Sequence, residues 1–319
     1  MTLDLSSSRV AVTGAAGLIG RSLLPKLLAA GADVVAIDVA DVDVDDAGTP
    51  GSLEVVTADV RERERLREVV AGCDGVAHLA SILTFACEQA PIDGFDINVA
   101  STIDVLEAAS RREGTRVVLA SSIGTYGPPP SPDHVHHEDD PLRGVSQYAT
   151  SKIVIERYGA AFAASRGLSS LWLRFGSVYG PWQAPHHVVP RFLVSVLDDI
   201  EAGRTPVVEF EPDGQHDLVF VDDAAEAVVR ALTCEADNQP VNVVTGVSRP
   251  LKEVFAEVLD LYGSDATIDW RPGSSPVPKQ RRFDPSRARE VLGYSPDTPL
   301  RDGLAALQSW RAEHRPAAG

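Results

Sequence analysis

The sequence contains little cysteine and no long apolar segment. Three cysteines, Cys73, Cys87 and Cys234, occur among 319 residues, and no two of them form a CxxC pair. We therefore expect neither a disulfide framework nor a cysteine-based zinc site, and a reducing cytoplasm suits such a chain. The opening residues, MTLDLSSSRVAVTG, lack a basic segment followed by an apolar secretory core, and no apolar run is long enough to span a membrane.

Positive charge is also scarce. The 29 lysines and arginines are outnumbered by 46 acidic residues, which gives a formal net charge of -17. A charge of this sign repels nucleic acid phosphates and acidic membrane surfaces, so we expect neither as a partner. The hydrophobic share of 44% and the charged share of 24% are ordinary for a globular protein, which excludes a largely disordered chain.

Short apolar segments alternate with longer segments of helical spacing in the first half of the chain. The predicted strands are Arg9–Thr13, Val34–Asp38, Leu53–Ala58, Gly75–Leu79, Thr115–Ala120 and Ser170–Phe175. The predicted helices are Leu18–Ala30, Arg61–Ala71, Asn98–Arg112 and Tyr148–Arg166. Strands and helices that alternate in this way imply right-handed parallel crossovers. The pattern therefore predicts an α/β fold with a doubly wound parallel sheet of the Rossmann type.

The chain changes character after about residue 176, where proline and glycine become frequent and the elements become shorter. Helices are predicted at Val188–Ala202, Asp222–Leu232 and Leu251–Tyr262, and Trp270–Asp284 is predicted to be a surface loop. We expect residues 1–176 to form a Rossmann domain that also takes late strands from beyond residue 176. Residues 177–319 are expected to form mainly a smaller, substrate-binding C-terminal lobe.

A glycine-rich turn lies directly between the first predicted strand and the first predicted helix. Residues 13–20 read TGAAGLIG, in which Gly14 permits a tight turn and Gly17 lets the backbone approach a pyrophosphate. Gly20 lets the helix pack close to the strand, and the helix N-terminus offers free N–H groups and a positive dipole to phosphates. This context predicts a dinucleotide site.

Two aspartates stand at the ends of predicted strands, where they can contact the adenosine half of the dinucleotide. Asp38 ends the second strand, where a carboxylate can accept both adenosine ribose hydroxyls and would repel a 2′-phosphate. No lysine or arginine occurs between Asp38 and Gly51, so NAD is favoured over NADP. Asp59 ends the third strand, where it could reach the adenine amino group or cap the helix that follows.

A tyrosine and a lysine begin the long helix predicted in the middle of the chain. Tyr148 and Lys152 stand four residues apart, on one helical face, so that the ammonium can stabilise the phenolate and lower the pKa of the tyrosine. Ser122 follows the fifth strand, at the sheet edge where ligands bind, and can hydrogen-bond the substrate oxygen that Tyr148 titrates. The alternative is a surface helix pair with an unrelated turn serine.

The motifs taken together resemble the extended short-chain dehydrogenase/reductases, that is, the NAD-dependent sugar epimerase/dehydratase family in its UDP-glucose 4-epimerase-like form. They run nearly from end to end: TGAAGLIG at 13–20, AHLAS at 77–81, INVAST at 97–102, SSIGTYG at 121–127, YATSK at 148–152, LRFGSVYGP at 173–181, DGQHDLVFVDDAA at 213–225 and RPG at 271–273. The resemblance also implies a homodimer joined by helices around 98–112 and 148–166.

The resemblance assigns roles to individual residues. It implies that Tyr148 is the general base and acid, that Lys152 binds the nicotinamide ribose and tunes Tyr148, and that Ser122 polarises the reacting hydroxyl or ketone. The expected cofactor-binding residues are Gly14, Ala16, Gly17, Leu18, Ile19, Gly20, Asp38, Asp59, Val60, Leu79, Ala80, Ser81, Asn98, Tyr148 and Lys152. The expected substrate-binding residues are Ser122, Tyr148, Ser177, His216 and Arg271.

The two residues that directly follow Ser122 narrow the type of reaction that we expect. Family members that dehydrate a hexose carry an acid pair there, and the sugar-acid decarboxylases usually keep a glutamate at the second position. Here the residues are Ile123 and Gly124, so both reactions are disfavoured. We therefore expect an epimerase of a nucleoside-diphosphate sugar, which acts at C4 through a transient 4-keto sugar. The alternatives are an NAD-dependent dehydrogenase or ketoreductase of a sugar or small alcohol, and a non-catalytic NAD-binding protein.

The expected diphosphate site departs from the family pattern. Ser177 stands where an asparagine is usual and His216 where an arginine is usual, whereas Arg271 matches the family's second diphosphate-binding arginine. Either the loop 182–187 compensates, or the substrate carries less charge. A histidine-rich acidic loop, His134–His137, is expected over the site entrance, and we predict no metal there.

Overall fold

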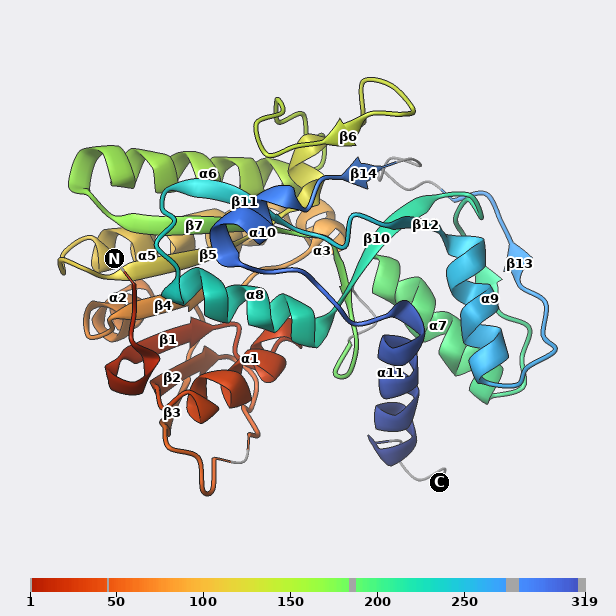
Figure 1. The fold of residues 1–319 in the computed structure, drawn as a ribbon, viewed down its shortest axis with the longest axis horizontal. Helices are drawn as coiled ribbons and strands as arrows, with labels where there is room; N and C mark the ends of the chain where they lie inside the picture. The colour runs from red at the N-terminus through yellow and green to blue at the C-terminus, as the bar shows by residue number, and fades with distance from the viewer. Residues whose placement is uncertain (1, 45, 184–187, 274–280, 315–319) are drawn as a thin grey trace.

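A parallel sheet of seven strands forms the centre of the protein (Figure 1). The computed structural model describes residues 2–44, 46–183, 188–273 and 281–314. The strands lie in the order β11-β7-β5-β4-β1-β2-β3. Their bounds are β1 Arg9–Thr13, β2 Asp33–Asp38, β3 Ser52–Thr57, β4 Gly75–His78, β5 Arg116–Ser122, β7 Ser169–Phe175 and β11 Gln239–Val243. Because β1 pairs with both β2 and β4, the strand order reverses at β1, as in a Rossmann fold.

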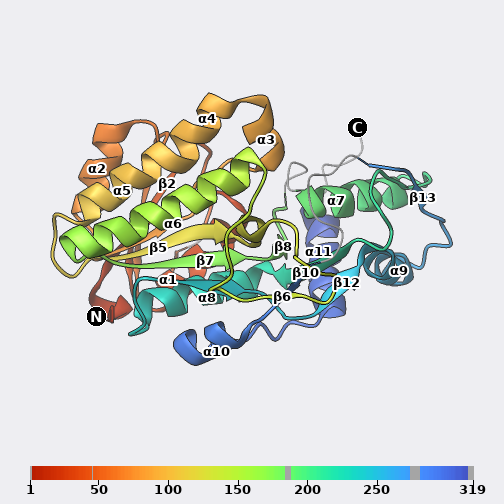
Figure 2. The same ribbon diagram turned by 90° about the horizontal axis from the view of Figure 1, so that it is seen from above.

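Helices cover both faces of this sheet (Figure 2). One face carries α1 Leu18–Ala29, α8 Val221–Thr233 and α10 Ser286–Leu292, and the other carries α2 Arg63–Ala71, α5 Ser101–Ala109 and α6 Gln147–Arg166. A strand that is covered on both sides is apolar along its length rather than in alternation. The runs Val10–Val12 and Val117–Leu119 are fully buried for this reason. The doubly wound α/β fold expected from the sequence is confirmed.

A second, smaller group of helices and strands is formed by the last half of the chain. It contains α7 Val188–Glu201, α9 Leu251–Leu261 and α11 Leu300–His314, together with a three-stranded sheet in the order β12-β10-β8. The bounds are β8 Ser177–Tyr179, β10 Gln215–Phe220 and β12 Ser248–Pro250, and a further pair joins β9 Val207–Val208 to β13 Asp269–Trp270. These elements share an apolar core of their own, with Phe210, Phe220 and Phe255 buried in it. We call this group the C-terminal lobe.

Several elements were not expected from the sequence. Among them are the short helices α3 Thr84–Gln89 and α4 Pro91–Phe95, and a π-helical turn, η2 Asp96–Ala100, that precedes α5. The predicted helix Asn98–Arg112 is therefore α-helical only over Ser101–Ala109. Within the described residues, no helix combines the length and the apolar character that a membrane crossing requires.

The prediction that Trp270–Asp284 is a surface loop is wrong at both ends. Trp270 belongs to β13, and Arg282–Phe283 form β14, which pairs with β6 Val135–His136. Phe283 is buried against the loop that precedes α6. Proline and arginine composition could not reveal this pairing because the partner strand lies far away in the sequence. Residues 274–280, in the middle of the segment, lie outside the described residues.

Candidate active site

A cavity of about 600 Å³ opens at the carboxyl ends of the central strands. Its wall includes the turn after β1, the ends of β2 and β3, the segment after β4, the end of β5 and the first turns of α6. Residues of the C-terminal lobe, among them Ser177 and Trp182, complete the wall. Ligands of open parallel sheets bind at this edge, where the strand order reverses.

The glycine turn forms one side of the cavity and is shaped for a bound pyrophosphate. Gly14 has φ +70°, and a Cβ on it would stand 2.7 Å from the backbone nitrogen of Ala80. The space around Gly20 is equally tight, because a Cβ there would collide with the carbonyl oxygen of Gly14. Helix α1 begins at Leu18 without a side-chain cap, so its first N–H groups face the turn. The expected residues Ala16, Gly17 and Ile19 also line the cavity.

Asp38 lines the cavity in a fixed orientation. Its carboxylate oxygens accept hydrogen bonds from the backbone N–H groups of Ala16 and Ala40, at 2.9 and 3.0 Å. Each oxygen has a second lone pair, so the group can still accept hydroxyls of a ribose. This arrangement fits the adenosine ribose of NAD.

Asp59 lies next to Asp38 along the same edge and does not cap the following helix. Helix α2 begins at Arg63 after Glu62, whereas the Asp59 carboxylate accepts from the backbone N–H and the guanidinium of Arg61. The hydrogen bond and charge of Arg61 hold the pKa of Asp59 below its usual value. Asp59 and Val60 both line the cavity, so the cap alternative is wrong and the adenine contact stays a prediction.

The segment after β4 contributes Leu79, Ala80 and Ser81 to the wall, but Asn98 stands behind it. Asn98 is buried, accepts from the Ser81 hydroxyl and the Ile82 N–H, and donates to the Ile82 carbonyl. It is absent from the described residues that line the cavity. Asn98 therefore positions the loop after β4, and the expectation of direct cofactor contact is not supported by its place.

Ser122, Tyr148 and Lys152 meet in the same cavity. The Ser122 hydroxyl accepts from the Gly124 N–H at 3.0 Å, which leaves its proton free for a hydrogen bond with Tyr148. The ammonium of Lys152 lies 5.5 Å from the centroid of the Tyr148 ring. Helix α6 explains this proximity, because it starts at Gln147 after an N-cap by Ser146 and places both residues on one face.

The pKa of Tyr148 is shifted upward, whereas the sequence predicted a downward shift. Burial raises the pKa of the Tyr148 phenol to about 12, and the hydrogen bond with Ser122 opposes this shift. Burial also lowers the pKa of Lys152 to about 8. Desolvation of the phenolate therefore outweighs the hydrogen bond with Ser122 in this structure, and the lowering of the tyrosine pKa by Lys152 stays a prediction.

A buried ion pair that the sequence did not reveal fixes α6 against the sheet. Glu156, four residues after Lys152, accepts from the Ser121 hydroxyl at 2.5 Å and forms a two-pronged ion pair with Arg174 of β7, whose shorter contact is 2.6 Å. Both partners are about 3% exposed. Ser121 precedes Ser122, so this network sets the distance between the serine and the tyrosine. The i, i+4 spacing of Lys152 and Glu156 was the one sequence signal available.

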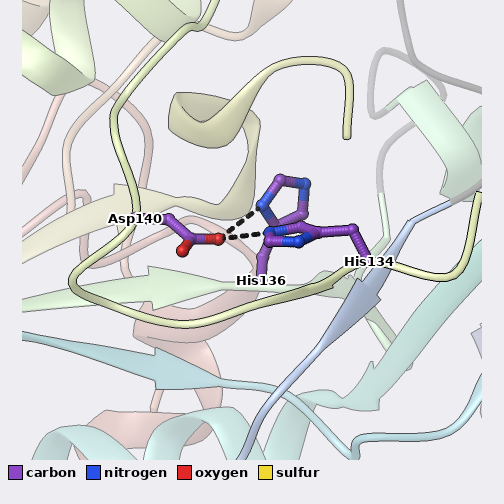
Figure 3. A group of neighbouring side chains, drawn as sticks. All are labelled: His134, His136 and Asp140. Carbon is purple, nitrogen blue, oxygen red and sulfur yellow. Dashed lines mark hydrogen bonds and ion pairs between the residues drawn. The ribbon is translucent and has the colours of Figure 1, made fainter. Parts of the chain in front are cut away.

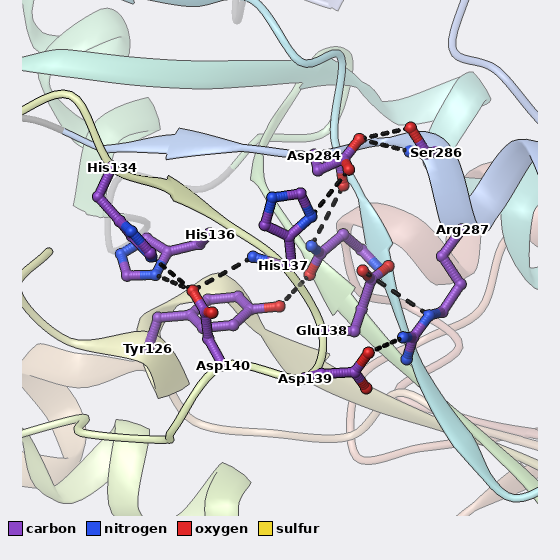
Figure 4. A network of polar contacts seen from close by, with 11 residues as sticks. Tyr126, His134, His136, His137, Glu138, Asp139, Asp140, Asp284, Ser286 and Arg287 are labelled. Carbon is purple, nitrogen blue, oxygen red and sulfur yellow. Dashed lines mark hydrogen bonds and ion pairs between the residues drawn. The ribbon is translucent and has the colours of Figure 1, made fainter.

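The histidine-rich loop is held by hydrogen bonds (Figures 3 and 4). One oxygen of Asp140 faces His134 Nε2 at 2.6 Å and His136 Nδ1 at 3.1 Å. Tyr126 stacks on His136, and its hydroxyl accepts from Arg174, which ties the loop to the sheet. His134, His136 and Asp140 are the one trio among the described residues whose donor atoms could share a metal ion, within 4.8 Å of one another. Their mutual hydrogen bonds account for the convergence, and none of the loop histidines is among the described residues that line the cavity.

The expected substrate residues of the C-terminal lobe are only partly brought together. Ser177 lines the cavity, whereas His216 is buried beneath the wall and Arg271 is exposed and paired with Asp269 at 2.7 Å. Residues 184–187 of the loop that was expected to compensate lie outside the described residues. Arg281, which lies in the segment predicted to be a surface loop, is buried and lines the cavity.

Comparison with known proteins decides the family. The model of the NAD-dependent epimerase/dehydratase family matches residues 10–245. The chain belongs to this family. It is 33% identical to a UDP-glucose 4-epimerase of Mycolicibacterium smegmatis over 310 residues, which cover 93% of this chain and 96% of that protein. It is 30% identical to a dTDP-glucose 4,6-dehydratase of Streptomyces griseus over 324 residues, which cover 97% and 95%.

Solved structures agree with this assignment. MoeE5 in complex with UDP-glucose and NAD superposes with a TM-score of 0.85 at 29% identity, over 96% of this chain and 99% of that one. The UDP-glucose 4-epimerase of Thermus thermophilus in complex with NAD gives a TM-score of 0.81 at 27% identity, over 94% and 99%. This epimerase/dehydratase-family protein is an enzyme whose cofactor is NAD, as expected from the sequence.

Proposed function

We propose that this family member is an NAD-dependent epimerase of a nucleoside-diphosphate sugar that acts at C4 through a transient 4-keto sugar. The observation that carries the proposal is the composition of the cavity wall around Ser122. Among the described lining residues the carboxylates are Asp38 and Asp59, and both lie at the ends of β2 and β3, away from Tyr148. Ile123 and Gly124 follow Ser122, so the reacting centre has one acid/base group, which suits oxidation and reduction without elimination.

The residues of the cavity divide the work of such a reaction. Ser122 donates to the oxygen of the reacting carbinol and orients it toward Tyr148. Tyr148 removes the hydroxyl proton and later returns it to the ketone oxygen. Lys152 holds positive charge next to the phenol and stabilises its ionised form. When bound, NAD supplies the acceptor and donor of the hydride, and its positive oxidised ring further favours the phenolate.

A second candidate is a dehydrogenase or ketoreductase of a sugar or small alcohol. It is favoured by the positions of His216 and Arg271, because neither of these expected diphosphate ligands lines the cavity among the described residues. A substrate with less charge would need neither. The third expectation, a non-catalytic NAD-binding protein, does not explain why Ser122, Tyr148 and Lys152 share one cavity.

One experiment separates these candidates. The purified enzyme is incubated with UDP-glucose, UDP-galactose, UDP-glucuronate and UDP-N-acetylglucosamine, while NMR follows the sugar and absorbance follows NADH. We expect conversion of at least one sugar to its C4 epimer without net NADH. Stoichiometric NADH with an oxidised product identifies a dehydrogenase, and no conversion of any sugar contradicts the epimerase proposal.

We also propose a homodimer, supported by apolar side chains that are exposed on neighbouring helices. Ile92 and Phe95 of α4 are 74% and 55% exposed, and Tyr158 of α6 is 41% exposed. Light scattering should give twice the chain mass, and Phe95→Glu should shift it to one chain mass. Val247→Glu, at an equally exposed apolar residue outside these helices, is the control. A reducing, cytoplasmic location remains part of the proposal, supported by three free cysteines.

A further inference from the structure

Arg281 is a buried cation at the wall of the active-site cavity that lacks a polar partner. Its exposed fraction is 7%, and it lines the cavity from the position directly before β14. The Nε atom is buried and unpartnered, and no hydrogen bond or ion pair of this guanidinium occurs among the described residues. Burial lowers the pKa of Arg281 to about 10, which still leaves it charged at neutral pH. A buried charge is stable only when a counter-charge or a set of hydrogen bonds compensates it.

The groups nearest to Arg281 do not fill this role. The ring centroid of Phe283 lies 5.9 Å from the guanidinium carbon, a contact that supplies no acceptor atom. Asp217 attracts Arg281 electrostatically but forms no ion pair with it in the described structure. Its carboxylate accepts instead from the N–H of Thr245 at 2.7 Å, the Thr245 hydroxyl at 2.9 Å and the N–H of Gly246 at 2.8 Å. Burial raises the pKa of Asp217 to about 6, so the carboxylate is still mainly ionised at pH 7, but the hydrogen bonds that it accepts come from Thr245 and Gly246 and not from Arg281.

Two histidines with free nitrogen atoms lie close to Arg281. Burial lowers the pKa of both His136 and His216, to about 3 for His216, and the charge of Arg281 lowers both further. His136 turns Nδ1 toward Asp140 (Figure 3), and its buried Nε2 has no partner. Both ring nitrogens of His216 are also buried and unpartnered. Four of the seven buried side-chain N or O atoms without a partner in the described structure therefore belong to these three neighbouring residues.

Of these three residues only Arg281 lines the cavity among the described residues, and its buried, unpartnered Nε there indicates a place for a polar ligand. The fixed charge of Arg281 selects an anion, and its planar fork suits a phosphate or a carboxylate. A water molecule could satisfy the histidines but would leave the positive charge uncompensated. Arg271 is less suited to bind this anion, because it is exposed and already paired with Asp269.

We propose that Arg281 is the anion-binding residue of the substrate cavity and that it binds an oxyanion of the substrate. This inference rests on the proposed function. The shared chemistry is that of a diphosphate or of a carboxylate carried by the sugar. Arg281 thereby takes the place that the sequence assigned to Arg271 and His216.

The test compares Arg281→Gln with Arg282→Gln, the same change at the exposed neighbour on β14. Calorimetry on the NAD-loaded enzyme measures affinity for uridine, UDP, UDP-glucose and UDP-glucuronate. Removal of a charged hydrogen-bond donor should weaken binding about 10- to 100-fold. Equal losses for UDP and both sugars, with none for uridine, assign the diphosphate. A loss confined to UDP-glucuronate assigns the carboxylate. Equal behaviour of the two variants overturns the proposal.

Two further measurements keep the outcome decisive. Arg281→Lys retains the charge, so it should recover part of the affinity that Arg281→Gln loses, and it replaces that variant if Arg281→Gln fails to fold. Inorganic pyrophosphate, titrated into wild type and variants, reports on the anion site without any sugar. Weak pyrophosphate binding that Arg281→Gln abolishes supports the site even if no nucleotide sugar is converted. Pyrophosphate, UDP and UDP-glucuronate binding that are all insensitive to both substitutions overturn it.

Discussion

The buried polar groups behind the two sides of the active-site cavity differ in how they are satisfied. We call the side formed by the central sheet and α6 the sheet end, and the side next to β10 and Arg281 the lobe end. At the sheet end, the buried His78 is bonded to the hydroxyls of Thr13 at 2.7 Å and Thr102 at 3.0 Å. At the lobe end, both ring nitrogens of the buried His216 lack a partner in the described structure, and so does Nε of Arg281. The buried His78 at the sheet end is hydrogen-bonded within the protein, whereas His216 and Nε of Arg281 at the lobe end have no partner in the described structure. The following predictions test this difference, from the largest expected effect to the smallest.

The largest effect is expected for Tyr148→Phe, which removes the proposed acid/base group at the sheet end. Turnover should fall about 10²- to 10⁴-fold, because proton transfer in the transition state is lost. NAD affinity should change little, since the glycine turn and Asp38 are untouched. Tyr158→Phe, an exposed tyrosine of the same helix, is the control. Full turnover by Tyr148→Phe would falsify its catalytic assignment.

Gly14→Ala should disrupt the sheet end of the cavity by distorting the backbone of the glycine turn. The new Cβ meets the Ala80 nitrogen at 2.7 Å, and φ of +70° is unfavourable for alanine. We expect a loss of about 1–3 kcal/mol in the free energy of unfolding and a weaker NAD affinity. Urea denaturation and NAD fluorescence titration measure the two. Gly72→Ala is the control, since its nearest contact would be an ordinary 3.6 Å; equal effects of both changes would contradict the steric argument.

Replacement of the two buried histidines, His78 and His216, should change the free energy of unfolding by different amounts. His78→Leu leaves the hydroxyls of Thr13 and Thr102 without their shared partner, which should cost about 1–3 kcal/mol in the free energy of unfolding. His216→Leu removes a group that has no partner to lose, so we expect a change of less than about 1 kcal/mol. Urea unfolding of both variants gives the comparison. A cost for His216→Leu as large as that of His78→Leu would show that the lobe end is internally bonded after all.

The pH dependence of stability provides a second measure of the same pair. Burial lowers the pKa of His78 and of His216 to about 3, below the value of about 6.5 in an unfolded chain. The unfolded state therefore binds more protons below pH 6.5, and stability falls as the pH decreases from there, by about 1.4 kcal/mol per pH unit for each histidine. Asp217, whose pKa is raised to about 6, acts in the opposite direction between about pH 6 and 4. Each leucine variant should flatten the slope between pH 6.5 and 5; an unchanged slope would contradict a neutral buried histidine.

The smallest effect is expected for Asp38→Asn, measured as cofactor preference. A neutral amide no longer repels a 2′-phosphate, so the ratio of NADP to NAD affinity should rise about tenfold. Asp33→Asn, at the exposed start of the same strand, should leave the ratio unchanged. Because both variants are compared as a ratio, a general weakening of binding does not affect the result. An unchanged ratio in Asp38→Asn would remove Asp38 from the ribose site.

The sequence anticipated the sheet end because each of its features is local. The turn between β1 and α1 is continuous, and Tyr148 and Lys152 share one helix, so their spacing alone sets their geometry. Asp38 and Ser122 were placed by the rule that parallel strands end at one edge. The cofactor, the family and the fold followed from these features. Direct cofactor contact by Asn98 is not supported by its place, because a motif match does not say whether a side chain faces the cavity or supports the loop behind it.

The lobe end could not be anticipated in the same way, since its residues meet only through distant pairings. Arg281 reaches the cavity because β14 pairs with β6, and His216 is buried because β10 lies between β8 and β12. Composition marked the Arg281 segment as a loop. The sequence by itself determined the fold, the cofactor and the shared position of Ser122, Tyr148 and Lys152, because short-range spacing and strand ends encode them. Only the tertiary structure decided which arginine is buried at the cavity wall, because burial and long-range strand pairing are properties of the packed chain.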